Sequence, residues 1–118
     1  MAVKDITPQK VDFNSIKNIT LEAVTAAEDG CKFIVPRDIA GSEYLTIIAQ
    51  NTGAAAYDVS VKAPANGGYA AADSDLILAD VPANGIVAIR VETAKYANND
   101  GSIIVTSENV AVKFAVIY

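Results

Sequence analysis

Hydrophobic and polar residues alternate with a period of two along the last third of this 118-residue chain. In residues 86–92, Val87, Ile89 and Val91 are separated by small or polar residues. Because successive side chains of a β-strand point to opposite faces, this pattern predicts a strand with one buried face. The same period returns in residues 110–117, so we expect another such strand there.

Residues that favour turns separate these runs. Asn98–Gly101 contains residues that tolerate positive φ, and Glu108–Asn109 is short enough for a two-residue hairpin loop. We therefore expect hairpin connections at both places. Asn98–Ser102 also resembles part of a calcium-binding loop, but Tyr96 stands where such a loop needs its first carboxylate, so a plain hairpin is favoured.

Five earlier segments also have the composition of short strands bounded by Gly, Pro, Asn or Asp. These segments are 18–24, 31–35, 43–51, 57–63 and 76–81. Residues 43–51 are apolar at most positions, which predicts a strand buried on both faces. Residues 64–75 are expected to form a long surface loop, and the sequence predicts no helix of useful length.

About nine short strands punctuated by Gly, Pro and Asn predict an all-β fold. We expect a single compact β-sandwich or jelly-roll-like domain of short antiparallel strands at residues 17–118. Residues 1–16 are expected to form an N-terminal arm, because Pro8 lacks a backbone donor and is tolerated only at an edge or at the start of a strand. A chain of this length buries a core without needing a disulfide or a metal.

Charge and hydropathy exclude several partners. The net charge is −5 and the basic residues are scattered, so we expect no nucleic-acid partner. No apolar run is long enough to span a bilayer, and Met1–Pro8 lacks the apolar core of a signal peptide. We therefore expect no membrane partner and synthesis in the cytoplasm. The single cysteine, Cys31, cannot form an internal disulfide and is expected to be a small buried hydrophobe.

The residues that carry chemistry are sparse. The chain has no histidine, the commonest general base and metal ligand. Asp73, Asp75 and Asp80 are the candidates for a carboxylate pair, but their loop and strand setting favours solvated acids. We therefore expect no enzyme activity, no catalytic residue, no cofactor and no metal site. Tyr69 and Tyr96 are the tyrosines that could be exposed for stacking against sugars, but core filling and packing at polar edges are favoured for most of the tyrosines.

The N-terminal arm carries the candidate docking residues. Its apolar positions are separated from the sandwich by the polar linker Asn14–Lys17. An apolar arm of this kind contacts a neighbouring molecule or adds a strand to the edge of its sheet. The predicted partner-binding residues are Ile6, Pro8, Val11 and Phe13.

Four segments carry a resemblance to a known family, and they are Met1–Lys10, Ile19–Gly30, Ile47–Gly53 and Glu92–Asn99. In these patterns the chain resembles the capsid decoration or head-fibre-like proteins of tailed bacteriophages. The resemblance implies a noncatalytic virion protein on the outer capsid surface that binds the major capsid protein as a homo-oligomer, with a trimer favoured. A phage tail or baseplate module, or a surface-exposed glycan-binding β-sandwich, has the same strand pattern and is the alternative.

Overall fold

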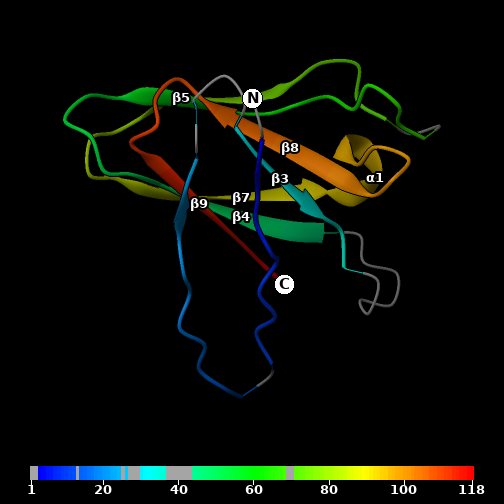
Figure 1. Ribbon diagram of the computed structural model, residues 1–118, viewed down its shortest axis with the longest axis horizontal. Coiled ribbons are helices and arrows are strands. Elements are labelled where there is room, and N and C mark those ends of the chain that lie inside the picture. The colour runs from blue at the N-terminus through cyan, green and yellow to red at the C-terminus, as the bar shows by residue number, and fades with distance from the viewer. Residues whose placement is uncertain (1–2, 13, 25, 27–29, 37–43, 69–70) are drawn as a thin grey trace.

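A computed structural model describes residues 3–12, 14–24, 26, 30–36, 44–68 and 71–118. Within these residues the chain forms two facing β-sheets and one short helix (Figure 1). The elements are β1 (Lys4–Asp5), β2 (Glu22–Ala23), β3 (Cys31–Ile34), β4 (Tyr44–Asn51), β5 (Tyr57–Val61), β6 (Leu76–Val81), β7 (Ile86–Glu92), α1 (Thr93–Tyr96), β8 (Ser102–Ser107) and β9 (Val112–Ile117). The prediction of an all-β fold with about nine short strands is confirmed.

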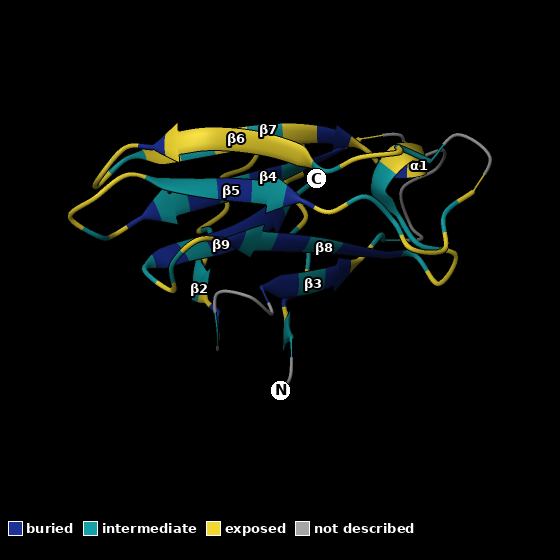
Figure 2. Ribbon diagram, turned by 90° about the horizontal axis from the view of Figure 1, so that it is seen from above, coloured by how far each residue is buried: buried dark blue, intermediate teal, exposed yellow. Residues whose placement is uncertain are grey.

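The first sheet has the strand order β1-β3-β8-β5-β6, and the second has the order β2-β9-β4-β7 (Figure 2). The strands pair antiparallel, except that β1 lies parallel to β3. Strands β1 and β2 are therefore the edges at one side of the sandwich, while β6 and β7 are the edges at the opposite side. No helix in the described part of the chain is long and apolar enough to cross a membrane.

The core lies between the two sheets and is built from alternate residues of the central strands. Strand β9 contributes Val112, Phe114 and Val116, all fully buried, as the period of two predicts. In β7, Val91 is buried and Val87 and Ile89 pack against the core, which confirms the expected inward face. Among the described residues, the other large hydrophobic side chains that are fully buried are Phe33, Leu45, Ile47, Val59, Val61, Val81, Ile103 and Val105.

Two of the predicted strands differ from expectation. Only Glu22–Ala23 of the segment 18–24 forms a strand. In β4, Leu45, Ile47 and Ala49 are buried, but the residues between them are half-buried. The prediction of burial on both faces was wrong here, because only one face of this sheet packs against the other sheet.

The two hairpins predicted near the C-terminal end do not form. Strands β8 and β9 belong to different sheets, so Glu108–Asn109 is part of a connection between sheets rather than a hairpin loop. Asn98–Gly101 likewise follows α1 and connects β7 of one sheet with β8 of the other. A period of two shows which residues share a face, but it does not show which strand the backbone pairs with.

The N-terminal segment is bound to the sandwich over much of its length. The Lys4 and Ile6 N–H groups donate to the carbonyl oxygens of Gly30 and Lys32, at 3.1 and 2.9 Å. Further along, the Gln9 N–H donates to the carbonyl oxygen of Val116 at 2.8 Å. Residues 4–11 thus run from the edge of the first sheet to β9 of the second and are hydrogen-bonded to both sheets.

Candidate docking site

The structure places the four predicted docking residues in different surroundings. Ile6 is only 6% exposed and belongs to the hydrophobic core, so it is not an exposed docking residue. Pro8 is half-buried, whereas Val11 is 38% exposed. Phe13 lies outside the described residues. Ile6 differs from expectation because β1 pairs with β3, and this pairing turns its side chain into the sandwich.

The Val11 N–H still donates to the carbonyl oxygen of Tyr118 at 2.8 Å, and beyond Val11 the chain leaves the sandwich and returns at Thr20. We call residues 12 and 14–19 the projecting loop; Figure 1 shows it extending away from the two sheets. Within it, Asn14 has a φ of 57°, and the Ser15 hydroxyl donates to the Asp12 carbonyl oxygen at 3.0 Å. The loop is therefore a turned-back excursion with its own local hydrogen bond.

Ile16 is the most informative side chain of the projecting loop. It is 98% exposed, more than any other large hydrophobic residue that the structure describes. Single exposed aliphatic residues are common, so exposure alone does not identify a site. Its place within the projecting loop, which extends from the domain (Figure 1), distinguishes Ile16 from the other exposed aliphatic residues.

The base of the projecting loop is closed by the side-chain amide of Gln9. Its Nε2 atom donates to the carbonyl oxygen of Thr20 at 3.0 Å, and its Oε1 atom accepts the N–H of Thr20 at 3.2 Å. The two ends of the loop are thereby held together beside β9. A loop closed at its base loses less conformational entropy on binding than an open one.

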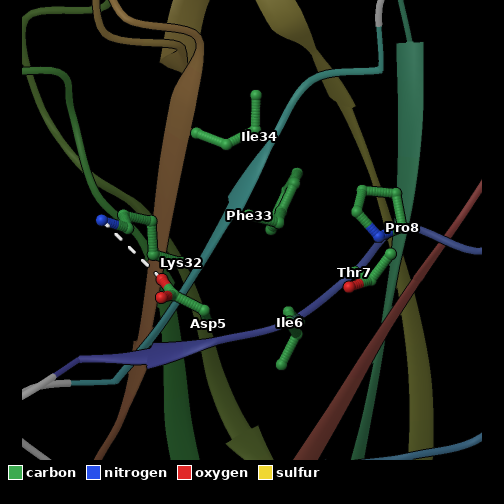
Figure 3. A pocket seen from close by; sticks show the side chains of 7 residues that line it. All are labelled: Asp5, Ile6, Thr7, Pro8, Lys32, Phe33 and Ile34. Atoms are coloured by element: carbon green, nitrogen blue, oxygen red, sulfur yellow. Dashed lines mark ion pairs between the residues drawn. The ribbon is translucent and has the colours of Figure 1, made fainter.

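A pocket of about 390 Å³ lies where β1 ends and the chain departs from β3 (Figure 3). The side chains of Ile6 and Phe33 form its apolar part, and Pro8 lies at the side where the chain turns towards the second sheet. At its rim, Lys32 forms an ion pair with Asp5 at 3.7 Å. Both groups are exposed, so this pair contributes at most about 1 kcal/mol.

The opposite side of the sandwich carries an apolar edge that the sequence analysis missed. Strand β6 is exposed along most of its length (Figure 2), with Leu76, Ile77 and Leu78 all accessible and Ile77 60% exposed. Ile86, at the start of β7, is 61% exposed. We call Leu76–Leu78 the apolar edge; Ile86 lies beyond the opposite end of β6, after the turn at residues 82–85. The sequence offers no local signal for this edge, because Leu76–Leu78 has the composition of a buried strand.

The fold keeps Asp75 and Asp80, two of the three candidate acidic residues, apart. Asp75 and Asp80 lie at the two ends of β6, about 16 Å apart at the usual rise of an extended strand, which is too far for an acid–base pair. The Lys62 ammonium donates to Asp75 at 2.7 Å, and the Ala63 N–H donates to it at 2.8 Å. These bonds lower the pKa of the Asp75 carboxyl. Asp73 is exposed in the preceding loop.

Residues 98–102, whose sequence resembles part of a calcium-binding loop, contain a turn held by hydrogen bonds between Asp100 and Ser102. Oδ1 of Asp100 accepts from the N–H and the hydroxyl of Ser102, at 2.9 and 2.6 Å, which lowers the pKa of this carboxyl. Across the described ranges, no group of three or more Cys, Asp or Glu side chains is arranged to hold a metal ion. Of the two tyrosines considered for sugar stacking, Tyr96 packs against the core, and Tyr69 lies outside the described residues.

The prediction for Cys31 is confirmed. Its side chain is fully buried, and this burial raises the pKa of the thiol to about 12, with a smaller contribution from the charge of Glu22. A thiol in this environment is a packing residue rather than a nucleophile.

Comparison with family models, with curated proteins and with solved structures finds no match to this chain.

Proposed function

We propose that this protein is a noncatalytic structural protein of a phage virion that binds the outer surface of an assembled capsid and decorates or stabilises it. The projecting loop is the observation that carries the proposal. It presents a nearly fully exposed Ile16 on an excursion whose base is closed by Gln9 and Thr20. The major capsid protein and neighbouring copies of this chain are the partners we propose for it.

The energetics of such a contact suit a protein that binds in many copies. Burying an isoleucine side chain contributes about 1.5–3 kcal/mol, so one loop forms a modest interface. On a shell, each docked copy is held close to several partner surfaces, and the effective concentration of the second contact is high. Weak single contacts therefore add up to firm attachment without any catalytic group.

The net charge of the protein supports a location on the outer surface of the capsid. The net charge of −5 is repelled by packaged DNA, which carries dense negative charge on the inside of the shell. The same charge has no such penalty on the outside. An outer location also leaves the projecting loop as the part that reaches towards the shell or towards a neighbour.

Cosedimentation with purified empty heads that lack this chain tests the proposal. Ile16→Asp should reduce binding about tenfold or more, because the apolar contact is lost and a charge must be desolvated. Replacing residues 12–18 with two glycines should abolish binding, while the hydrogen bond from Val11 to Tyr118 and the closure at Gln9 and Thr20 remain possible. Val110→Asp is the matched control, since Val110 is an exposed aliphatic residue of another loop, 48% accessible.

Full binding by the shortened variant would overturn the proposal, as would an equal loss in the Val110 control. Deleting residues 2–13 is a poorer experiment, because it removes β1 and the buried Ile6 together with the start of the loop. A loss of binding would then report a damaged core rather than a missing contact.

A further inference from the structure

We propose that a pocket on the outer face of the first sheet binds a neutral saccharide. The pocket has a volume of about 560 Å³ and lies where β3 and β8 meet the connections that follow β5 and α1. This volume falls within the range of roughly 300–1,000 Å³ that is usual for small-ligand sites. The inference is independent of the docking role of the projecting loop, which lies away from the connection between α1 and β8 (Figure 1).

The floor of the pocket is formed by neighbouring strands of the first sheet. Lys32 of β3 and Ile104 of β8 are cross-strand partners, and both line the pocket. The residues before and after them on each strand are buried in the core, so the period of two directs Lys32 and Ile104 to the outer face. Val3, which precedes β1, adds a second aliphatic side chain. The floor therefore offers a small aliphatic surface beside one ammonium group.

The wall of the pocket is formed by two connections that hydrogen bonds hold together. The Asn99 N–H donates to the carbonyl oxygen of Asn66 at 2.6 Å, and the Asn66 N–H donates to Oδ1 of Asn98 at 3.1 Å. Nδ2 of Asn98 donates to the carbonyl oxygen of Ser102 at 3.2 Å. Both ends of the Asn98 amide are thus used inside the protein. The wall is organised before a ligand arrives, which reduces the entropy lost on binding.

The other two amides of the wall are available to a ligand. The side chains of Asn66 and Asn99 belong to exposed residues and form no hydrogen bond within the part of the chain that the structure describes. Each amide offers a carbonyl oxygen that accepts and an NH₂ group that donates. A sugar hydroxyl also donates and accepts, so these amides match a ring carrying several hydroxyl groups better than a ligand that only accepts.

Charge favours a neutral ligand over an anionic one. Lys32 and Asp100 line the pocket with opposite charges, and Asp5 lies 3.7 Å from the Lys32 ammonium. The hydrogen bonds from Ser102 and, to a smaller extent, the charge of Lys32 lower the pKa of the Asp100 carboxyl, so this group is ionised at neutral pH. An anion in the pocket would meet two carboxylates and one cation, whereas a hydroxyl group accepts from Lys32 and donates to Asp100 without this repulsion.

The composition of the pocket also predicts the strength of binding. None of the described residues that line it is aromatic, so a sugar ring gains only the aliphatic contact with Val3 and Ile104. We therefore expect weak binding, with a Kd of about 1 mM.

Titration of the full chain, followed by proton–nitrogen correlation NMR spectra, tests the inference. Glucose, galactose, mannose and N-acetylglucosamine are added separately up to about 20 mM, well above the expected Kd. At least one of them should give saturable shifts that centre on the amide signals of Lys32 and Ile104. Asn66→Ala and Asn99→Ala should each raise the Kd about fivefold, because a hydroxyl group loses its hydrogen-bond partner. Gln50→Ala is the matched control, since this amide belongs to β4 of the second sheet, and it should leave the Kd unchanged.

Three outcomes would overturn the inference. The first is the absence of a saturable shift with every one of these sugars. The second is saturable binding of inorganic phosphate at a lower concentration than any sugar, which would show a site selective for anions. The third is the same Kd for Asn66→Ala, Asn99→Ala and Gln50→Ala, which would place the sugar elsewhere.

Urea unfolding controls for the fold of the three variants. Because the Asn66 and Asn99 side chains form no hydrogen bond within the described residues, their replacement should leave the unfolding midpoint nearly unchanged. None of the titration outcomes bears on cosedimentation with empty heads, so a failure here is distinguishable from a failure of the proposed function.

Discussion

The side chain of Gln9 takes the place of a strand partner for the backbone of Thr20. Its amide donates to the Thr20 carbonyl oxygen at 3.0 Å and accepts the Thr20 N–H at 3.2 Å. The backbone of Gln9 at the same time donates to Val116 and accepts from Tyr118. One residue therefore joins both ends of the projecting loop to β9.

Gln9→Ala should open the base of the projecting loop. Each lost hydrogen bond contributes about 0.5–1.5 kcal/mol, so opening should become about tenfold more frequent. Trypsin cleavage at Lys17 under native conditions measures this opening, because a protease acts on transiently opened segments. Gln9→Glu is the matched control, since it keeps the acceptor and the size but loses the donor, and it should give an intermediate rate. An unchanged cleavage rate in both variants would contradict the role given to this amide.

A second polar side chain joins the two sheets from inside. Asn51, at the end of β4, is fully buried, and its Nδ2 atom donates to the carbonyl oxygens of Ala55 and Val81, at 2.7 and 3.0 Å. Its Oδ1 atom accepts the N–H of Gly53 at 2.9 Å. Val81 is the last residue of β6 in the other sheet. The Asn51 side chain therefore fixes the position at which the chain turns after β6.

Asn51→Ala should lower the free energy of unfolding by about 2–4 kcal/mol, because buried backbone groups lose their partners. Urea unfolding followed by circular dichroism measures the change. Gln50→Ala, at the neighbouring half-buried position, is the control and should change stability by about 0.5 kcal/mol. A loss at Asn51 no larger than that at Gln50 would show that these bonds do not hold the turn.

The sequence pattern predicted which residues share a face of a strand better than it predicted which strands pair with each other. Val112, Phe114 and Val116 share a buried face because a period of two has the same meaning in any sheet. The hairpin expected at Glu108–Asn109 was wrong, since the sheet that a strand joins depends on contacts with residues far away in the sequence.

The dependence of strand pairing on distant residues also explains why the sequence analysis misplaced Ile6 and missed the apolar edge. Ile6 looked like a docking residue of the arm, but a parallel pairing with β3 buries it, and no local pattern announces that pairing. The apolar edge was missed for a related reason. Leu76–Leu78 has the composition of a buried strand, and only the strand order makes β6 an edge.

Gly30 is a position where only glycine fits. Its φ is 63°, and a Cβ atom there would overlap the carbonyl oxygen of Val105 and the side chain of Thr106 on β8. Gly30→Ala should therefore lower the free energy of unfolding by about 2–4 kcal/mol, from left-handed backbone strain and from the steric overlap.

Gly68→Ala is the matched control for this substitution, because no atom lies within 4 Å of a Cβ built there. It should change stability by about 0.5 kcal/mol or less. Urea unfolding midpoints of both variants provide the measurement. Equal midpoints for the two would refute the close approach of Gly30 to β8.

The last prediction concerns pH and the carboxyl of Asp75. Hydrogen bonds from the Lys62 ammonium and from the Ala63 N–H lower its pKa below the ordinary value of 3.8. A carboxyl whose pKa is lower in the folded state contributes stability that is fully present above the unfolded-state pKa and is lost as the pH falls through the folded-state value. The contribution is small, because both side chains are partly exposed.

Asp75→Asn removes the charge but keeps an oxygen that accepts from the Ala63 N–H. The unfolding free energies of the two proteins should therefore differ above about pH 5 and converge as the pH falls below 3.8. Asp73→Asn, an exposed carboxylate two residues earlier, controls for the change in net charge. A difference that stays constant from pH 7 to the acid limb would mean that the Lys62–Asp75 pair does not stabilise the start of β6. The apolar edge would then depend for its position on Asn51 and on the hydrogen bond from the Asp80 N–H to Oδ1 of Asp58.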